Sequence, residues 1–191
     1  YSRDEIPNDI TEETRASFEP AIEYVVVKSP RFNFEQFTPT KPVLGTQLKS
    51  VGEAMSIGYS IKEALQKALA SRETDSAGFD HEIKHPNLTK EELIEDIATP
   101  TPSRIYQVAE ALRLGITEEE VFEHSAIDPW FVREIAEIIT AEEDLKTKSL
   151  TDLNSEDLSE LKLMGFTDER LAQVLSTSTK EVIKYRKSQN V

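Results

Sequence analysis

The stretch GITEEEVFEHSAIDPWFVREI, residues 115–135, decides the fold of the C-terminal half of this chain. It contains two helix-start signals. Thr117 is followed three residues later by Glu120, a capping box in which the hydroxyl and the carboxylate each accept a backbone N–H that has no helical partner. Asp128 followed by Pro129 is the second signal, a good N-cap and then the residue best tolerated at the first helical position. The stretch therefore predicts a short helix, a tight turn and a longer helix.

The longer helix carries an apolar stripe that must be covered. Phe131, Ile135, Ile138 and Ile139 recur at helical spacing. Trp130 adds a large flat indole beside this stripe. We expect these five residues to lie either in the helical core or on a surface for self-association. If Trp130 is in the core, its replacement by alanine costs roughly 3–5 kcal/mol. If it is at an interface, stability depends on protein concentration.

Helical patterns continue on both sides of this stretch. Residues 104–114 place their apolar side chains on one face and end at Gly115, a favoured helix terminator. Residues 155–164 repeat the arrangement and end at Gly165, and further helices follow. The sequence Gly115-Ile-Thr-Glu-Glu is echoed by Gly165-Phe-Thr-Asp-Glu at an offset of 50 residues. This echo predicts a duplicated helical unit, with a chance match as the alternative.

The N-terminal part has a different chemistry. Residues 22–28, IEYVVVK, are rich in β-branched and aromatic side chains and predict a strand ended by Pro30. Phe32, Phe34 and Phe37 follow closely and are interpreted as core anchors rather than an aromatic cage. Residues 45–49 are a second candidate strand.

Gly52 and Gly58 in SVGEAMSIG, residues 50–58, permit turns or close backbone approach, as a phosphate-binding loop requires. Their spacing matches neither the P-loop nor the dinucleotide fingerprint, so ligand contact is the weaker interpretation. Helices are then predicted from the capping pairs Ser60–Glu63 and Thr89–Glu92.

Between these helices, His81 and His85 lie four residues apart, but Gly78 and Pro86 favour a solvated loop over a zinc site. After the second helix, ATPTP at 98–102 forms a stiff linker. We therefore predict an α+β chain with two domains: a small β-containing domain over residues 1–98 and an all-α helical domain over residues 99–191.

Composition limits the functions available. The formal net charge of -14 repels a phosphate backbone, so a nucleic-acid partner is disfavoured. No apolar run reaches the length of a membrane span, and no signal-peptide pattern begins the chain, which predicts a cytoplasmic protein without a membrane partner. There is no cysteine, and three histidines lie outside any catalytic pattern, so no nucleophile and base are apparent. The first residue, Tyr1, suggests a piece of a longer protein.

Three long stretches resemble the large chain of carbamoyl phosphate synthase. They are NDIT…ASFEPAIEYVVVKSPRF (8–32), TQLKSVGEAMSIG (46–58) and RIYQVAEALRLGITEEEVFEHSAIDPWFVREI (104–135), and the resemblance continues through KLMGFTDERLAQVL (162–175). It implies that the first two stretches are the C-terminal remnant of the first ATP-grasp domain, which makes carboxyphosphate from bicarbonate and ATP. It also implies that the helical stretch is the oligomerisation domain.

For the intact enzyme, the resemblance implies ATP with magnesium or manganese, ammonia from a glutaminase small subunit, and roles in arginine and pyrimidine synthesis. The family's nucleotide-holding and metal-holding residues lie upstream of residue 1, so the isolated chain is expected to be inactive. Ile22 alone matches a position that the family associates with the wall of the internal tunnel.

The alternative hypothesis is a free-standing helical interaction module. A DNA-reading helix-turn-helix at the C terminus is disfavoured by the net charge.

Overall fold

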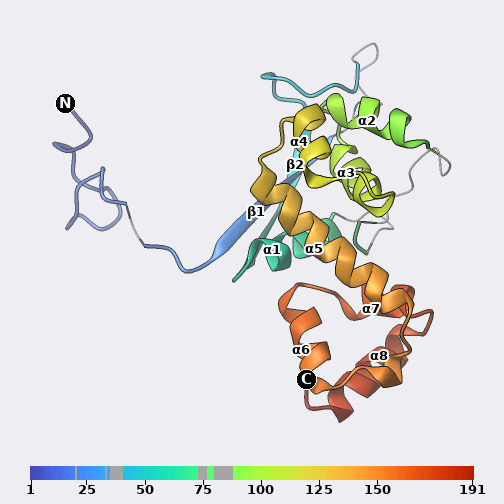
Figure 1. The fold of residues 1–191 in the computed structure, drawn as a ribbon. Helices are drawn as coiled ribbons and strands as arrows, with labels where there is room; N and C mark the ends of the chain where they lie inside the picture. The colour runs from blue at the N-terminus through green and yellow to red at the C-terminus, as the bar shows by residue number, and fades with distance from the viewer. Residues whose placement is uncertain (20, 33, 35–40, 73–76, 80–87) are drawn as a thin grey trace.

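The computed structural model describes residues 1–19, 21–32, 34, 41–72, 77–79 and 88–191. Within these ranges the chain forms a small antiparallel sheet and a set of α-helices, so the fold is α+β and mostly helical, as predicted (Figure 1). The elements are β1 (Val25–Phe32), β2 (Ser50–Gly58), α1 (Ile61–Ala70), α2 (Lys90–Ala98), α3 (Arg104–Arg113), α4 (Glu118–Ser125), α5 (Pro129–Lys146), the 3-10 turn η2 (Leu150–Asp152), α6 (Ser155–Leu163), α7 (Asp168–Val174) and α8 (Thr179–Ser188).

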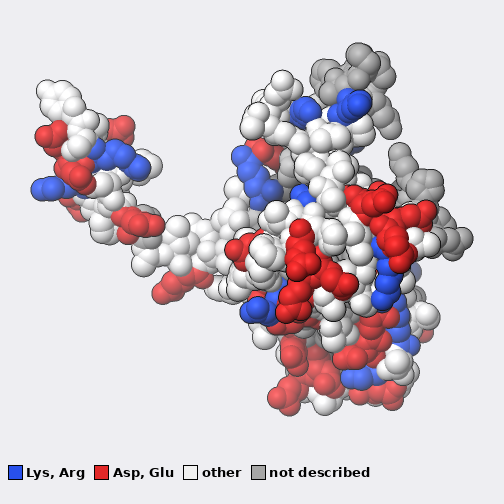
Figure 2. All heavy atoms as spheres, turned by 45° about the horizontal axis from the view of Figure 1, so that its top comes forward, with Lys and Arg blue, Asp and Glu red and all other residues white. Residues whose placement is uncertain are grey.

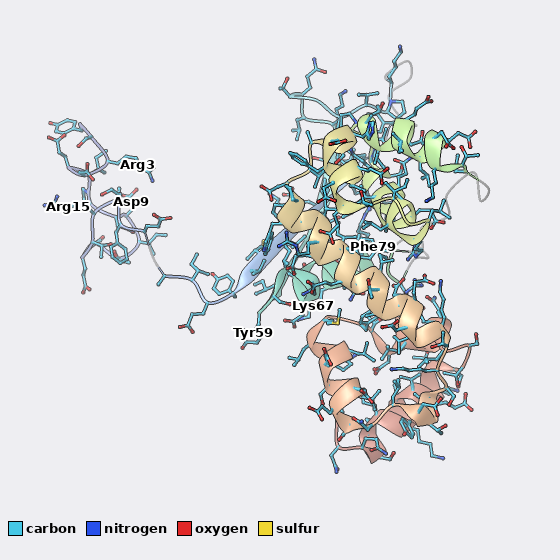
Figure 3. All side chains as sticks on the ribbon, in the orientation of Figure 1. Arg3, Asp9, Arg15, Tyr59, Lys67 and Phe79 are labelled. Carbon is cyan, nitrogen blue, oxygen red and sulfur yellow. The ribbon has the colours of Figure 1, made fainter. Side chains whose placement is uncertain are left out.

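Residues 1–19 lie away from the helices (Figure 1). Figure 3 marks this segment with Arg3, Asp9 and Arg15, which are far from the helical body. An isolated bridge between Pro7 and Arg15 closes a turn within it. The segment therefore adds nothing to the core.

β1 differs from its prediction at both ends. It begins at Val25 rather than Ile22, and it runs through Pro30 to Phe32. The register with β2 extends from Val25↔Gly58 to Phe32↔Ser50, with an irregularity between Arg31 and Phe32. Because β1 has one partner strand in the described part of the chain, a proline is tolerated on it, as on other edge strands.

The second strand also lies elsewhere than predicted. Residues 45–49 form no strand, and the glycine-containing stretch Ser50–Gly58 is β2. Pairing with β1 overrides the breaking tendency of Gly52, since strand preference depends mainly on the neighbouring strand. Gly58 lies against α1, where an added Cβ would come within 2.8 Å of the backbone nitrogen of Ala64. This close approach gives a structural reason for glycine there.

Phe32, the last residue of β1, and Phe34 are not core anchors. Phe32 and Phe34 stack on each other with ring centroids 5.9 Å apart, and both are only partly buried. Phe37 lies outside the described residues, as do His81 and His85.

One buried cluster joins the helices. α1 packs against both strands and against α5, while α2 packs against α3 and α4. The cluster contains Leu69 of α1, Leu93 and Ile97 of α2, Val108 of α3 and Ile138 of α5, all at most 2% exposed. It therefore runs across residue 98, and the division into domains at that position stays a prediction.

The 50-residue echo corresponds to a repeated backbone. Gly115 and Gly165 both have positive φ, +76° and +95°. The following N–H groups donate five residues back, Ile116 to Ala111 and Phe166 to Leu161, at 3.0 and 3.1 Å. This is the Schellman helix ending. The chain also enters the left-handed region at Ala126 and Ser176. The two units are α3–α5 and α6–α8.

An ion pair fastens α8 to α7. Arg186 donates through Nε and Nη2 to the two oxygens of Asp168, at 3.0 and 2.9 Å. Burial raises the pKa of Asp168, but hydrogen bonds from Arg186 and Lys162 lower it, and the net pKa lies below the ordinary value of 3.8. A depressed carboxyl pKa stabilises the folded state above the unfolded-state pKa, and this stabilisation is lost as pH falls through the folded-state pKa.

We expect Asp168→Asn to lower the melting temperature at neutral pH and to flatten its decline below about pH 4. The measurement is the melting temperature as a function of pH for both proteins. Asp144→Asn, at an exposed position of α5, is the control and should follow the wild-type curve. Parallel curves for wild type and Asp168→Asn would contradict the assignment.

Candidate functional site

An aromatic pair occupies the first turn of α5. Asp128 caps the helix, its Oδ1 accepting the N–H of Trp130 at 2.9 Å, with Pro129 at the first position. The rings of Trp130 and Phe131 lie nearly perpendicular, 79°, with centroids 4.9 Å apart. Trp130 is 47% exposed and Phe131 46%. The core interpretation is therefore wrong for these two residues, and with it the loss of roughly 3–5 kcal/mol that it implied for Trp130→Ala.

The rest of the stripe is buried. Ile135, Ile138 and Ile139 are at most 5% exposed. The exposure differs along one helix because Ile135, Ile138 and Ile139 belong to the buried cluster, which does not extend to the first turn of α5. Periodicity identifies the apolar face of the helix, but it does not indicate how much of the helix length is covered by other parts of the protein.

The same stripe contains a carboxylate. Glu142 is fully buried and accepts hydrogen bonds from Arg170 of α7, Nε to Oε1 at 2.9 Å and Nη2 to Oε2 at 3.0 Å. Arg113 of α3 donates Nη2 to Oε2 at 2.7 Å. Arg113 also donates to the carbonyl of Phe79 (labelled in Figure 3). Glu142 therefore ties the two helical units together. It was missed in the sequence, although it lies four residues after Ile138 on the apolar face.

One face of the sheet is also apolar and open. Val26 and Ile57 are direct partners in the register and are 45% and 52% exposed. Met55 and Val51 extend this face along β2, and both are more than half exposed. Tyr59, just after β2, is 86% exposed (Figure 3). Ile22 precedes β1 and is 58% exposed. It is not among the residues that line the pocket described next, and its tunnel role stays a prediction.

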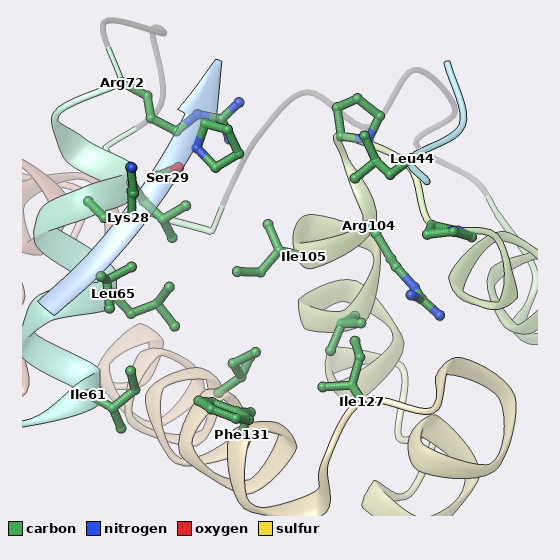
Figure 4. Close-up of a pocket in the computed structure, with 18 of the residues that line it drawn as sticks. Lys28, Ser29, Leu44, Ile61, Leu65, Arg72, Arg104, Ile105, Ile127 and Phe131 are labelled. Carbon is green, nitrogen blue, oxygen red and sulfur yellow. The ribbon is translucent and has the colours of Figure 1, made fainter. Parts of the chain in front are cut away.

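A pocket of about 540 Å³ lies between two layers, with β1 and α1 on one side and α3 and α5 on the other (Figure 4). Its walls are mainly aliphatic. Ile61 and Leu65 of α1 line it, and Ile105 points into it from α3. Leu44 and the segment of residues 100–102 border it as well, and the N–H of Leu44 donates to the carbonyl of Pro100 at 2.7 Å.

The charged groups around the pocket differ in their partners. Lys28 pairs with Glu53 at 2.9 Å, and Glu134 pairs with Lys62 at 3.3 Å. Arg104 donates to the carbonyls of Ile97 and Ser125, and burial lowers the pKa of its guanidinium. Arg72 donates Nη1 to the hydroxyl of Tyr106 at 3.1 Å. Its buried Nε has no hydrogen-bond partner in the described structure.

The described residues offer little for ATP or metal binding. They contain no group of three or more His, Asp or Glu side chains placed to hold a metal ion. The glycine-containing stretch considered for phosphate contact is a paired strand. The side chains of the described ranges therefore do not fit a nucleotide–metal site. No described helix is long and apolar enough to cross a bilayer.

The fold defines the class: a mostly helical module attached to a small two-stranded sheet. Residues 53–190 match the family described as carbamoyl-phosphate synthetase large chain, oligomerisation domain, and the chain belongs to this family. The match begins within β2 and covers every helix that the structure describes.

Relatives agree over nearly the whole chain. The carbamoyl phosphate synthase large chain of Synechocystis sp. is 46% identical over 188 residues, covering 98% of this chain and 17% of the relative. The large chain of Brucella melitensis is 47% identical over 191 residues, covering 97% and 16%. The arginine-specific, chloroplastic large chain of Arabidopsis thaliana is 41% identical over 183 residues, covering 95% and 15%. The chain thus spans about 17% of the length of the first of these relatives.

Proposed function

We propose that this chain serves as the scaffold and self-association segment of a carbamoyl phosphate synthase large chain. The observation that carries the proposal is the half-exposed Trp130–Phe131 pair in a chain whose family is named for oligomerisation. Aromatic side chains, tryptophan above all, are enriched among residues that dominate binding energy at protein interfaces. The preceding cap and proline fix the backbone here, so association orders few additional groups.

We further propose that the sheet is a remnant of the first ATP-grasp domain. Its open face, with Val26 and Ile57 paired near one end and Met55 and Val51 further along β2, supports this proposal, because a two-stranded sheet is marginal alone. The remainder of the large chain is the proposed cover. Residues 1–98 and 99–191 remain the proposed parts, with Ile22 as the proposed contribution to the tunnel wall.

For the intact protein we infer an ATP-dependent ligase that makes carbamoyl phosphate from bicarbonate, ammonia and two ATP. Its proposed partners are a glutaminase small subunit and ATP with Mg or Mn, held by residues outside this chain. Arginine synthesis is supported by the similarity to the arginine-specific large chain of Arabidopsis; pyrimidine synthesis rests on the family resemblance alone. The proposed location is the cytoplasm. Acidic side chains spread over the helical body disfavour a nucleic-acid partner (Figure 2).

The self-association proposal is tested with Trp130→Ala. We expect the wild-type chain to associate as its concentration rises, and the variant to need at least about tenfold more protein, since central interface aromatics contribute on the order of 2 kcal/mol. Sedimentation velocity over a concentration series measures this directly. The melting temperature of the dilute variant should stay close to that of the wild type, because Trp130 lies outside the core.

Tyr59→Ala is the matched control, because it removes another exposed aromatic ring from a different surface. It should associate like the wild type. A wild-type chain that stays monomeric throughout, or equal weakening by both substitutions, would contradict the assignment of the interface to Trp130.

A further inference from the structure

The pocket between β1–α1 and α3–α5 has the size and lining of a ligand site. Its volume of about 540 Å³ falls within the ~300–1,000 Å³ typical of small-molecule pockets. Such pockets are mostly apolar with a few polar groups that fix the ligand's orientation. Here Ile61, Leu65 and Ile105 supply aliphatic walls (Figure 4). Among the charged groups of the lining, Lys28, Glu134 and Arg104 have the partners given above, whereas Arg72 has a buried donor without one. Arg72 lies at one end of the pocket, with Phe131 at the other.

Arg72 has one edge of its guanidinium open. Nη1 donates to Tyr106, and the guanidinium lies 5.8 Å from the centroid of that ring. Nε is buried without a partner, and no hydrogen bond in the described structure uses Nη2. A buried donor without an acceptor destabilises the folded protein. An acceptor entering the pocket would remove this penalty.

Two other arginines of this chain bind a carboxylate through their Nε–Nη2 edge. Arg170 holds the two oxygens of Glu142 through Nε and Nη2, at 2.9 and 3.0 Å. Arg186 holds Asp168 in the same way, at 3.0 and 2.9 Å. The planar fork of the guanidinium matches a carboxylate in two parallel hydrogen bonds. Within the described residues, Arg72 pairs with no carboxylate.

We propose that this pocket binds a small amphipathic carboxylate, with the carboxylate on the Nε–Nη2 edge of Arg72 and the apolar part along α1 and α3 toward Phe131. Glu134 lies near the Phe131 end, on the same helix, and opposes an anion there. This places the carboxylate at the Arg72 end. This binding role goes beyond the proposed scaffold function, and it needs no reaction step.

Octanoate is a suitable probe, with octanol and octylamine as matched compounds of the same chain length. Trp130 is the single tryptophan and its ring contacts Phe131, so its fluorescence reports occupancy of the apolar end. We expect octanoate to shift this fluorescence saturably and to raise the melting temperature. Octanol should bind at least about tenfold more weakly, and octylamine more weakly still, because neither satisfies both donors.

Arg72→Met should weaken octanoate at least about tenfold and leave octanol unchanged, while Arg72→Lys keeps the charge without the fork and should give an intermediate loss. Arg133→Lys, at an exposed position of α5, is the control and should bind like the wild type. Equal affinity for octanoate and octanol in the wild type would overturn the proposal without any variant. So would octanoate binding that survives Arg72→Met, or no saturable binding.

Equilibrium dialysis of labelled octanoate against the complete large chain, wild type and Arg72→Met, tests the site in the assembled enzyme. The proposal is supported if the complete wild-type large chain binds octanoate and its Arg72→Met variant does not. If octanoate bound the isolated 191-residue chain but not the complete large chain, another part of the large chain would fill the pocket, and the ligand site would be overturned. Neither result depends on whether Trp130 mediates self-association, which sedimentation decides separately.

Discussion

Replacing Gly165 with alanine is expected to destabilise the protein by roughly 3 kcal/mol, from two separate causes. Gly165 has a φ of +95°, a left-handed conformation in which a Cβ is strained. The added Cβ would also lie 2.8 Å from the Cα of Glu63 and 3.1 Å from its carbonyl oxygen. These are backbone atoms of α1, so α1 and the turn before α7 must separate. The neighbouring hydrogen bond from Gln66 Nε2 to the carbonyl of Met164, 3.0 Å, would be weakened as well.

The repeat provides the matched control. Gly115 occupies the equivalent position in the first helical unit, with a φ of +76°, but an added Cβ would meet only the Nζ of Lys90 among the described residues, at 3.7 Å. Gly115→Ala should therefore lower the free energy of unfolding only by the conformational strain of a Cβ at positive φ, about 1 kcal/mol. Urea unfolding of the two variants measures the difference. Equal losses would mean that the contact between α1 and the second unit is absent in solution.

Glu142→Gln is expected to cost roughly 3–5 kcal/mol, because removing one partner from a buried ion pair leaves the others uncompensated. Glu142 is fully buried and holds Arg113 and Arg170 at once. The amide keeps one acceptor oxygen, but its NH2 group would face a guanidinium. Since the two arginines come from different helical units, unfolding of the variant should also become less cooperative.

Glu143→Gln is the control on the next residue. Its side chain is 44% exposed; it pairs with Lys146 on the surface and, at a longer distance of 3.8 Å, with Nε of Arg113. Because Glu142 stays in place to hold Arg113, the loss should stay within about 0.5 kcal/mol. Chemical unfolding followed by circular dichroism compares the three proteins. A small loss for Glu142→Gln, similar to that of the control, would contradict the role assigned to the buried cluster.

Several features were determined by the sequence alone because they depend on residues close together in the chain. The capping boxes at Thr89 and Thr117 and the N-cap at Asp128 formed as predicted, since each hydrogen bond joins residues two or three apart. The helix endings at Gly115 and Gly165 belong to the same group. Family membership also followed, because it rests on long matching stretches and not on contacts.

Other features were decided only by the tertiary structure, because they depend on residues far apart in the chain. Residues 50–58 are a strand because residues 25–32 pair with them, which local glycine content does not indicate. Ile138, on the predicted stripe, is buried, whereas Trp130, beside the stripe, is half-exposed. The reason is that the buried cluster covers only the later turns of α5. Arg72 faces an apolar pocket because α3 lies opposite α1. Caps and periodicity specify each helix, but which part of a helix is covered depends on the surfaces that the rest of the chain brings against it.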